Sequence, residues 1–196
     1  MEQGFSPVPS SLLTRAAFPK GGAALLFLNG SRARKALRYD PPMFLTTLVL
    51  HSLLRWAVLA FGLLALVRAF SGWSGRRPWT SLDDRAGKYF VLALDLQTLI
   101  GLVLYAGLSP MTRAAFSNMG AAMKDPLLRF FAVEHVTLML IGVALVHVGR
   151  VRARKALTDQ ARHRAAAIFF LLGLLAIAMG IPWPGRVVGR PLLPTF

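Results

Sequence analysis

The chain contains no cysteine, and charged residues are scarce for its length of 196 residues. The absence of cysteine excludes disulfides, CxxC redox chemistry, thiolate zinc sites, iron–sulfur clusters and a cysteine nucleophile. Charged residues make up only 16% of the chain, whereas soluble domains carry about 25%, so they cannot coat a surface exposed to water. Acidic residues are scarcer than basic ones: the chain has 8 Asp and Glu against 23 Lys and Arg, which gives a net charge of +15. GxSxG, HExxH and P-loop patterns are also missing, which argues against a hydrolase.

Hydrophobic residues, by contrast, account for 55% of the chain, and the mean hydropathy is +0.54. Four apolar stretches approach the roughly 20 residues that a helix needs to cross a bilayer. They cover residues 43–70, 89–108, 127–149 and 165–181, and turn-forming residues separate them. Backbone in hydrocarbon must satisfy its own hydrogen bonds, and the alternation typical of outer-membrane strands is absent. The sequence therefore predicts an all-α integral membrane protein, in which residues 43–196 form an up-down four-helix bundle.

Residues 1–42 differ from the rest because they are basic and contain only a short apolar run. Three interpretations stay open. Met43 is the true start and the upstream stretch is a mis-assigned leader, or the stretch is a basic extension lying on the surface, or it is a targeting segment.

Lys and Arg are distributed unevenly among the predicted connections. Residues 71–88 and 150–164 carry ten of them, whereas the middle connection and the C-terminal tail carry four. The positive-inside rule then places 71–88 and 150–164 in the cytoplasm, and we expect a bacterial inner membrane. Counting the six basic residues of 1–42 would make the two sides equal, so the topology depends on the start site. The basic loops indicate contact with membrane lipid, because no aromatic or motif signal supports nucleic-acid binding.

Two histidines lie inside predicted spans at matching depth. His51 is about eight residues into the first span, and His135 about eight residues into the third. Because these spans run in the same direction, both imidazoles are predicted about 12 Å below one membrane face. Two histidines at one depth on two helices of a bundle are typical of a bis-histidine haem, with the iron between the helices.

Several residues near these histidines could serve a haem. Arg55 follows His51 by four residues and so lies on the same side of the helix, while Arg129 lies near the outer end of the third span. Either arginine can pair with haem propionates. Gly142 falls on the predicted face of His135 and could admit a macrocycle, although glycines also let membrane helices pack closely. Alternatively, Arg55 pairs with Glu134 without any ligand.

Other polar residues inside the spans are functional candidates because ionisable groups in a bilayer are costly. His147 and His163 form a candidate second site at the cytoplasmic side, for a second haem or a quinone. His147 lies twelve residues after His135, so the two side chains differ by about 120° around the helix and lie on different faces. The alternative is that His147 and His163 are simply interfacial histidines. Asp95 and Gln97 are proton or quinone candidates in the second span. The aspartate could relay protons, accept a quinol hydroxyl, bind a cation, or form a hydrogen bond or salt bridge within the bundle.

Several strings occur together: HSLLRW at 51–56, GLVLY at 101–105, AMKD at 122–125, RFFAVEH at 129–135 and IPWP at 181–184. This pattern resembles a small family of bacterial four-span membrane proteins of the cytochrome-b-like type. The resemblance covers about residues 43–196. It implies that His51 and His135 are the haem ligands.

Three functions follow from these observations. The first is electron transfer by haem b, in or beside a respiratory or photosynthetic complex and with quinone as a further candidate cofactor, because bis-histidine ligation leaves no open iron position. The second is a haemless accessory subunit bound to other membrane subunits. The third is proton-coupled transport through Asp95 and Glu134, although the repeats typical of transporters are not evident. An electron-transfer or accessory subunit is favoured over a stand-alone enzyme.

Overall fold

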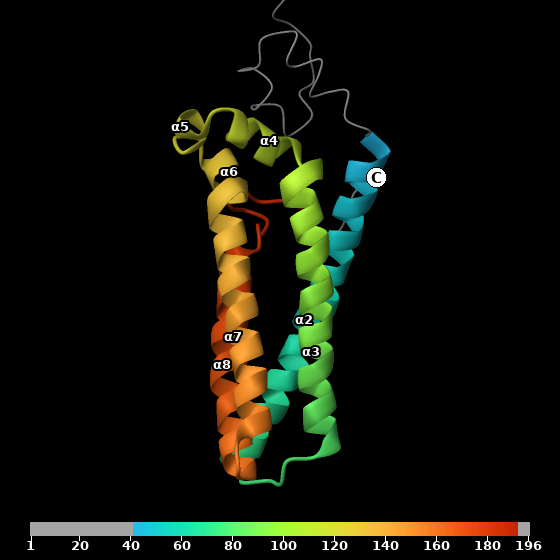
Figure 1. Cartoon of the computed structure of the whole chain (residues 1–196), viewed down its shortest axis with the longest axis vertical. Helices are drawn as coiled ribbons and strands as arrows, with labels where there is room; N and C mark the ends of the chain where they lie inside the picture. The colour runs from blue at the N-terminus through green and yellow to red at the C-terminus, as the bar shows by residue number, and fades with distance from the viewer. Residues whose placement is uncertain (1–40, 192–196) are drawn as a thin grey trace, which may run out of the picture. The chain divides into compact units, whose positions relative to one another are not determined.

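The computed structural model of the protein describes residues 41–191, and this part of the chain is all-helical (Figure 1). Four segments are long and apolar enough to cross a membrane. They contain the helices α2 (Pro41–Ser74), α3 (Ser81–Val103), α7 (His135–Lys155) and α8 (Asp159–Gly180). The predicted all-α bundle of four membrane helices is therefore confirmed. The predictions about the N-terminal segment concern residues 1–42, of which 1–40 lie outside the described residues.

The four long helices alternate in direction, since α2 and α7 run one way and α3 and α8 the other (Figure 1). Helix α2 packs against α3 and α8, and α7 packs along α8, whereas α3 and α7 touch less extensively. This pattern makes α2 and α7 diagonal partners in the bundle. Residues on their inner faces consequently meet across the interior.

The helices extend beyond the predicted spans at the end that carries the α2–α3 and α7–α8 connections. Helix α3 begins at Ser81 and not at 89, α7 continues to Lys155, and α8 begins at Asp159. A capping box starts α3, in which the Thr80 hydroxyl accepts the Asp83 N–H and the Asp83 carboxylate accepts the Thr80 N–H at 2.8 Å. Hydropathy marks only the apolar part of a helix, whereas caps set its ends in the polar layer.

At the other end, the predicted middle connection is itself helical. Three short helices occupy it: α4 (Pro110–Ser117), α5 (Met119–Ala122) and α6 (Pro126–Arg129). Each begins after a side chain that accepts backbone N–H groups, and these caps are Ser109, Asn118 and Asp125. Figure 1 shows the three helices joining the ends of α3 and α7.

Small residues let the long helices approach one another. Along α2 the buried positions recur every three or four residues: Val58, Gly62, Ala65, Ala69 and Gly72. A Cβ on Gly62 would lie 2.7 Å from the Leu174 side chain and 2.9 Å from that of Phe90. Close packing of small residues is the main way in which membrane helices associate, and large apolar side chains remain on the outer surface.

Candidate functional site: two histidines in the bundle interior

His51 on α2 and His135 on α7 face each other across the bundle. Their ring centroids lie 6.5 Å apart, and the rings are inclined at 69°. Both residues are mostly shielded from solvent. The structure thus brings together the two histidines that the sequence pairs by depth, and it does so through the diagonal relation of α2 and α7.

The His135 ring is oriented by the last turn of α8. Its Nδ1 lies 2.7 Å from the carbonyl oxygen of Gly180. Because a carbonyl only accepts, Nδ1 donates, and Nε2 of the neutral ring keeps a lone pair. A backbone carbonyl in this role is a common partner of metal-bound imidazoles. A Cβ on Gly180 would collide with Met139, so glycine permits this approach.

The His51 ring contacts α3 through Gln97. The Gln97 amide nitrogen donates to the His51 carbonyl oxygen at 3.0 Å and lies 3.2 Å from His51 Nε2. Since the amide nitrogen donates, Nε2 accepts and Nδ1 carries the proton. Among the described residues, His51 Nδ1 and Gln97 Oε1 are buried without a hydrogen-bond partner. Such atoms are uncommon and costly.

Gly101 borders the same ring from the next turn of α3. A Cβ at this position would lie 3.0 Å from Cε1 and 3.6 Å from Nδ1 of His51. Every larger residue would therefore press on the imidazole. Gly101, and not Gly142, is the glycine that leaves space at the histidine pair.

Gly142 lies at the contact between α7 and α8. A Cβ there would sit 2.7 Å from the Ile177 side chain and 3.2 Å from the Gly173 carbonyl oxygen. The prediction that Gly142 admits a macrocycle is not supported by this position. Its role is the close packing of two helices.

The cations near the histidines are Arg55 and Arg190. The charge of Arg55 acts on His51, and that of Arg190 acts on His135. Arg190 lies over the Phe131 ring, 4.4 Å from its centroid, and burial lowers the pKa of its guanidinium. Arg190 is not among the predicted site residues. The Pro and Gly residues between 182 and 189 indicate a turn, but they do not predict that Arg190 comes to lie beside His135.

Arg129 and Glu134 form an ion pair with each other at 2.7 Å. The alternative pairing of Glu134 with Arg55 stays a prediction. The pair spans the π-helical segment η4 (Phe130–Glu134), and both side chains are about 40% exposed. Arg129 is thus already neutralised at the edge of the histidine site.

Two π-helical segments lie between Gly101 and His135 in the chain, and neither was predicted. Segment η3 (Leu104–Leu108) ends the second span, and η4 leads directly into His135. The Tyr105 hydroxyl donates to the Ala132 carbonyl at 2.8 Å and so ties the two segments together. Widened turns disturb the regular i→i+4 ladder and are frequent at functional sites. Helical periodicity gives no signal for them.

His147 and His163 are not brought together by any described contact. His147 Nε2 lies 2.7 Å from Asp95 Oδ1, which links α7 to α3. His163 is fully buried, its ring contacts Gly72 of α2, and its centroid lies 4.8 Å from the Trp79 ring. One histidine therefore faces α3 and the other faces α2, which argues against a shared second haem.

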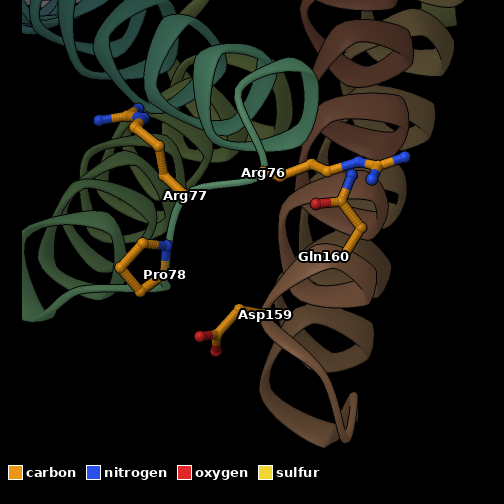
Figure 2. A pocket seen from close by; sticks show the side chains of 5 residues that line it. All are labelled: Arg76, Arg77, Pro78, Asp159 and Gln160. Carbon is orange, nitrogen blue, oxygen red and sulfur yellow. The ribbon is translucent and has the colours of Figure 1, made fainter.

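Two surface depressions lie near the end with the short connections. A groove of about 490 Å³ runs between α3 and α7 and includes His147. A depression of about 590 Å³ is lined by Arg76, Arg77, Pro78, Asp159 and Gln160 (Figure 2). Several of its polar groups bind the protein itself. Arg77 donates to the Ser71 hydroxyl at 2.6 Å, and Gln160 donates to the Trp73 carbonyl at 2.7 Å.

Comparison of the chain with protein-family models, curated proteins and solved structures gives no match. The resemblance to cytochrome-b-like proteins therefore stays a prediction.

The two imidazoles supply the nitrogen donors that a bis-histidine haem would need. Their 6.5 Å centroid separation and inclination of 69° are those of an edge-to-face ring pair. His51 and His135 would therefore be the residues that hold a haem. The Gln97 amide would have to turn away from His51 Nε2 when that nitrogen binds a metal. The same rotation would also move Gln97 Oε1, which has no hydrogen-bond partner among the described residues.

Proposed function

We propose that the protein is a membrane electron-transfer subunit that holds haem b between His51 and His135. The observation that carries the proposal is the approach of these imidazoles to 6.5 Å from diagonal helices. When bound, haem b supplies one-electron oxidation and reduction. We further propose a bacterial inner membrane, with the α2–α3 and α7–α8 connections in the cytoplasm, and a larger respiratory or photosynthetic complex as partner.

The chain's own residues would position the cofactor and adjust its charge environment. The Gly180 carbonyl holds the His135 ring in the tautomer that leaves Nε2 unprotonated. The positive charges of Arg55 and Arg190 act on the two imidazoles. They would pair with propionates and favour the reduced state, because positive charge stabilises an added electron.

The proposal is tested by a reduced-minus-oxidised spectrum and a pyridine haemochrome assay on the purified protein, expressed with ample haem supply. We expect about one haem b per chain, as bis-histidine ligation requires. His51→Ala and His135→Ala should each lower the haem content at least about tenfold, since one axial ligand is lost. His147→Ala is the matched control, because it lies on the same helix as His135 and should keep the haem.

The proposal fails if the wild-type protein is folded, as judged by circular dichroism and gel filtration, yet colourless. It also fails if His147→Ala loses haem as strongly as His135→Ala.

A haemless accessory subunit is the second candidate, and the Gln97–His51 hydrogen bond favours it. In that case the His51 Nε2 lone pair is already used within the protein. A partner complex that co-purifies equally with wild type, His51→Ala and His135→Ala, all of them colourless, would support this candidate. Proton transport through Asp95 and Glu134 is less favoured, because these carboxylates belong to separate pairs. Asp95 on α3 pairs with His147 on α7, and Glu134 in η4 pairs with Arg129 in α6.

A further inference from the structure

The groove between α3 and α7 combines a basic rim with two valines and His147. Lys88, Arg150 and Arg154 supply positive charge, and Asp84 supplies negative charge. Arg150 is largely buried and binds Asp84 at 2.7 Å. Neither Lys88 nor Arg154 forms an ion pair with a described residue, and both are exposed. Their charges nevertheless act on Asp84 together with that of Arg150, so the three cations surround one small space.

These charges lie at the headgroup layer or a few Å below it. The second span has 28 residues and is therefore about 42 Å long, close to the roughly 40–45 Å of a bilayer with its headgroups. Arg150 lies five residues from the end of α7 at Lys155, which is about 8 Å. Lys88 is about 10 Å from the start of α3, and a lysine at this depth can extend its amine outward.

Toward the membrane interior the groove is lined by Val91, about one turn deeper than Lys88 on α3, and by His147 on α7, whose Nε2 is bound to Asp95. Val151 lies beside Arg150, nearer the rim. A molecule that fills this groove would therefore need an anionic end near the basic rim and an apolar part beside the valines. A phospholipid with a phosphodiester meets both needs, whereas a free anion meets only the first.

We propose that this groove binds the phosphate of an anionic phospholipid, with Lys88 and Arg154 as its direct contacts and Arg150 held in place by Asp84. Excess positive charge makes an anionic lipid a better ligand than a zwitterionic one. Basic pockets between membrane helices bind such headgroups. The site is independent of the histidine pair and does not rest on the haem proposal.

Native mass spectrometry of the full chain in detergent tests the site, with 1-palmitoyl-2-oleoyl phosphatidylglycerol as the probe and phosphatidylcholine with the same acyl chains as reference. We expect preferential binding of phosphatidylglycerol. The double variant K88Q/R154Q should weaken it about 30-fold, as expected for two basic contacts. The matched control is R85Q/R164Q, which removes the same charge from exposed positions outside the groove.

Equal weakening by both double variants would assign the effect to bulk surface charge and overturn the site. Equal binding of the two lipids, or no effect of K88Q/R154Q, would also overturn it. Inorganic phosphate should displace the lipid no more than chloride does at the same ionic strength. Displacement by phosphate alone would assign the groove to a free anion and overturn the lipid as its ligand.

Discussion

The two imidazoles of the candidate site use different ring nitrogens for their contacts with the protein. His135 donates from Nδ1 to Gly180, so its Nε2 is available without any rearrangement. His51 accepts at Nε2 from Gln97, and its buried Nδ1 has no partner among the described residues. We infer that His135 is the preorganised half of the site and that His51 is the half that must adjust when a ligand binds.

A substitution at Gly101 tests whether His51 must adjust when a ligand binds. In Gly101→Ala, the new methyl group would lie 3.0 Å from His51 Cε1, and the ring must move because the surrounding helices are closely packed. We expect the haem content to fall several-fold while the protein remains inserted and folded. The pyridine haemochrome assay measures the effect.

Gly107→Ala is the matched control, because a Cβ on Gly107 meets nothing within 4 Å. It lies six residues further along the same span and should leave the haem content unchanged. If Gly101→Ala retains full haem, the space beside His51 is not part of the cofactor site.

Single residues also show which parts of the site can be read from sequence. His51 and His135 can be paired by depth because the starts of both spans are identifiable in the sequence. The third span starts at Asp125 and Pro126, where the Asp125 side chain caps α6. The partners of the rings could not be read in this way. Gly180 lies 45 residues beyond His135, and its contact depends on how α8 packs against α7. Arg190 depends on the path of the C-terminal segment.

At the scale of elements, His135 directly follows the π-helical segment η4, whereas His51 lies within the continuous helix α2. Helical periodicity predicts the apolar lengths of the spans and most of their packing faces. It cannot place η3 and η4, because a widened turn shifts every later residue by about 100° around the axis. The widened turn of η4 therefore contributes to the orientation of His135 toward His51, and helical periodicity does not predict this turn.

The hydrogen bond that joins η3 to η4 should contribute measurably to the free energy of unfolding. Tyr105→Phe removes the hydrogen bond to the Ala132 carbonyl and leaves that oxygen without its side-chain donor. We expect a loss of about 1 kcal/mol, which corresponds to a fall in Tm of roughly 2–4 °C for a chain of this size. Thermal unfolding in detergent, followed by circular dichroism, measures it.

Tyr89→Phe provides the reference, since Tyr89 is exposed on the same span and its ring packs against Phe61 at 5.9 Å. Its Tm should stay within about half a degree of wild type, because no buried partner is lost. Equal shifts in the two variants would mean that the Tyr105 hydroxyl does not hold the π-helical segments together.

At the scale of the whole molecule, the unequal contacts between helices divide the bundle into a tight side and a looser one. Helix α8 packs closely on α7 and α2, whereas α3 and α7 touch less and leave the basic groove between them. His135 begins α7, which follows α4, α5 and α6, whereas the groove residues lie toward the α2–α3 and α7–α8 connections. A cofactor at one end and an anionic lipid at the other would thus occupy separate halves of one bundle.

The orientation of this bundle is open to a direct test, because the chain has no cysteine and any introduced thiol is unique. Leu157 lies in the α7–α8 connection and is 98% exposed, and Asn118 is exposed at the opposite end. With the basic connections inside, a membrane-impermeant maleimide should label Asn118→Cys in intact cells and label Leu157→Cys only after the membrane is opened.

The reverse labelling pattern would show that the ten basic residues of the two connections do not set the topology. The six basic residues of 1–42 would then have to be counted with the opposite side. That result would move the Lys88–Arg154 groove to the outer leaflet and require an anionic lipid there. It would leave the haem proposal intact, because the 6.5 Å between His51 and His135 does not depend on which face of the membrane they lie beneath.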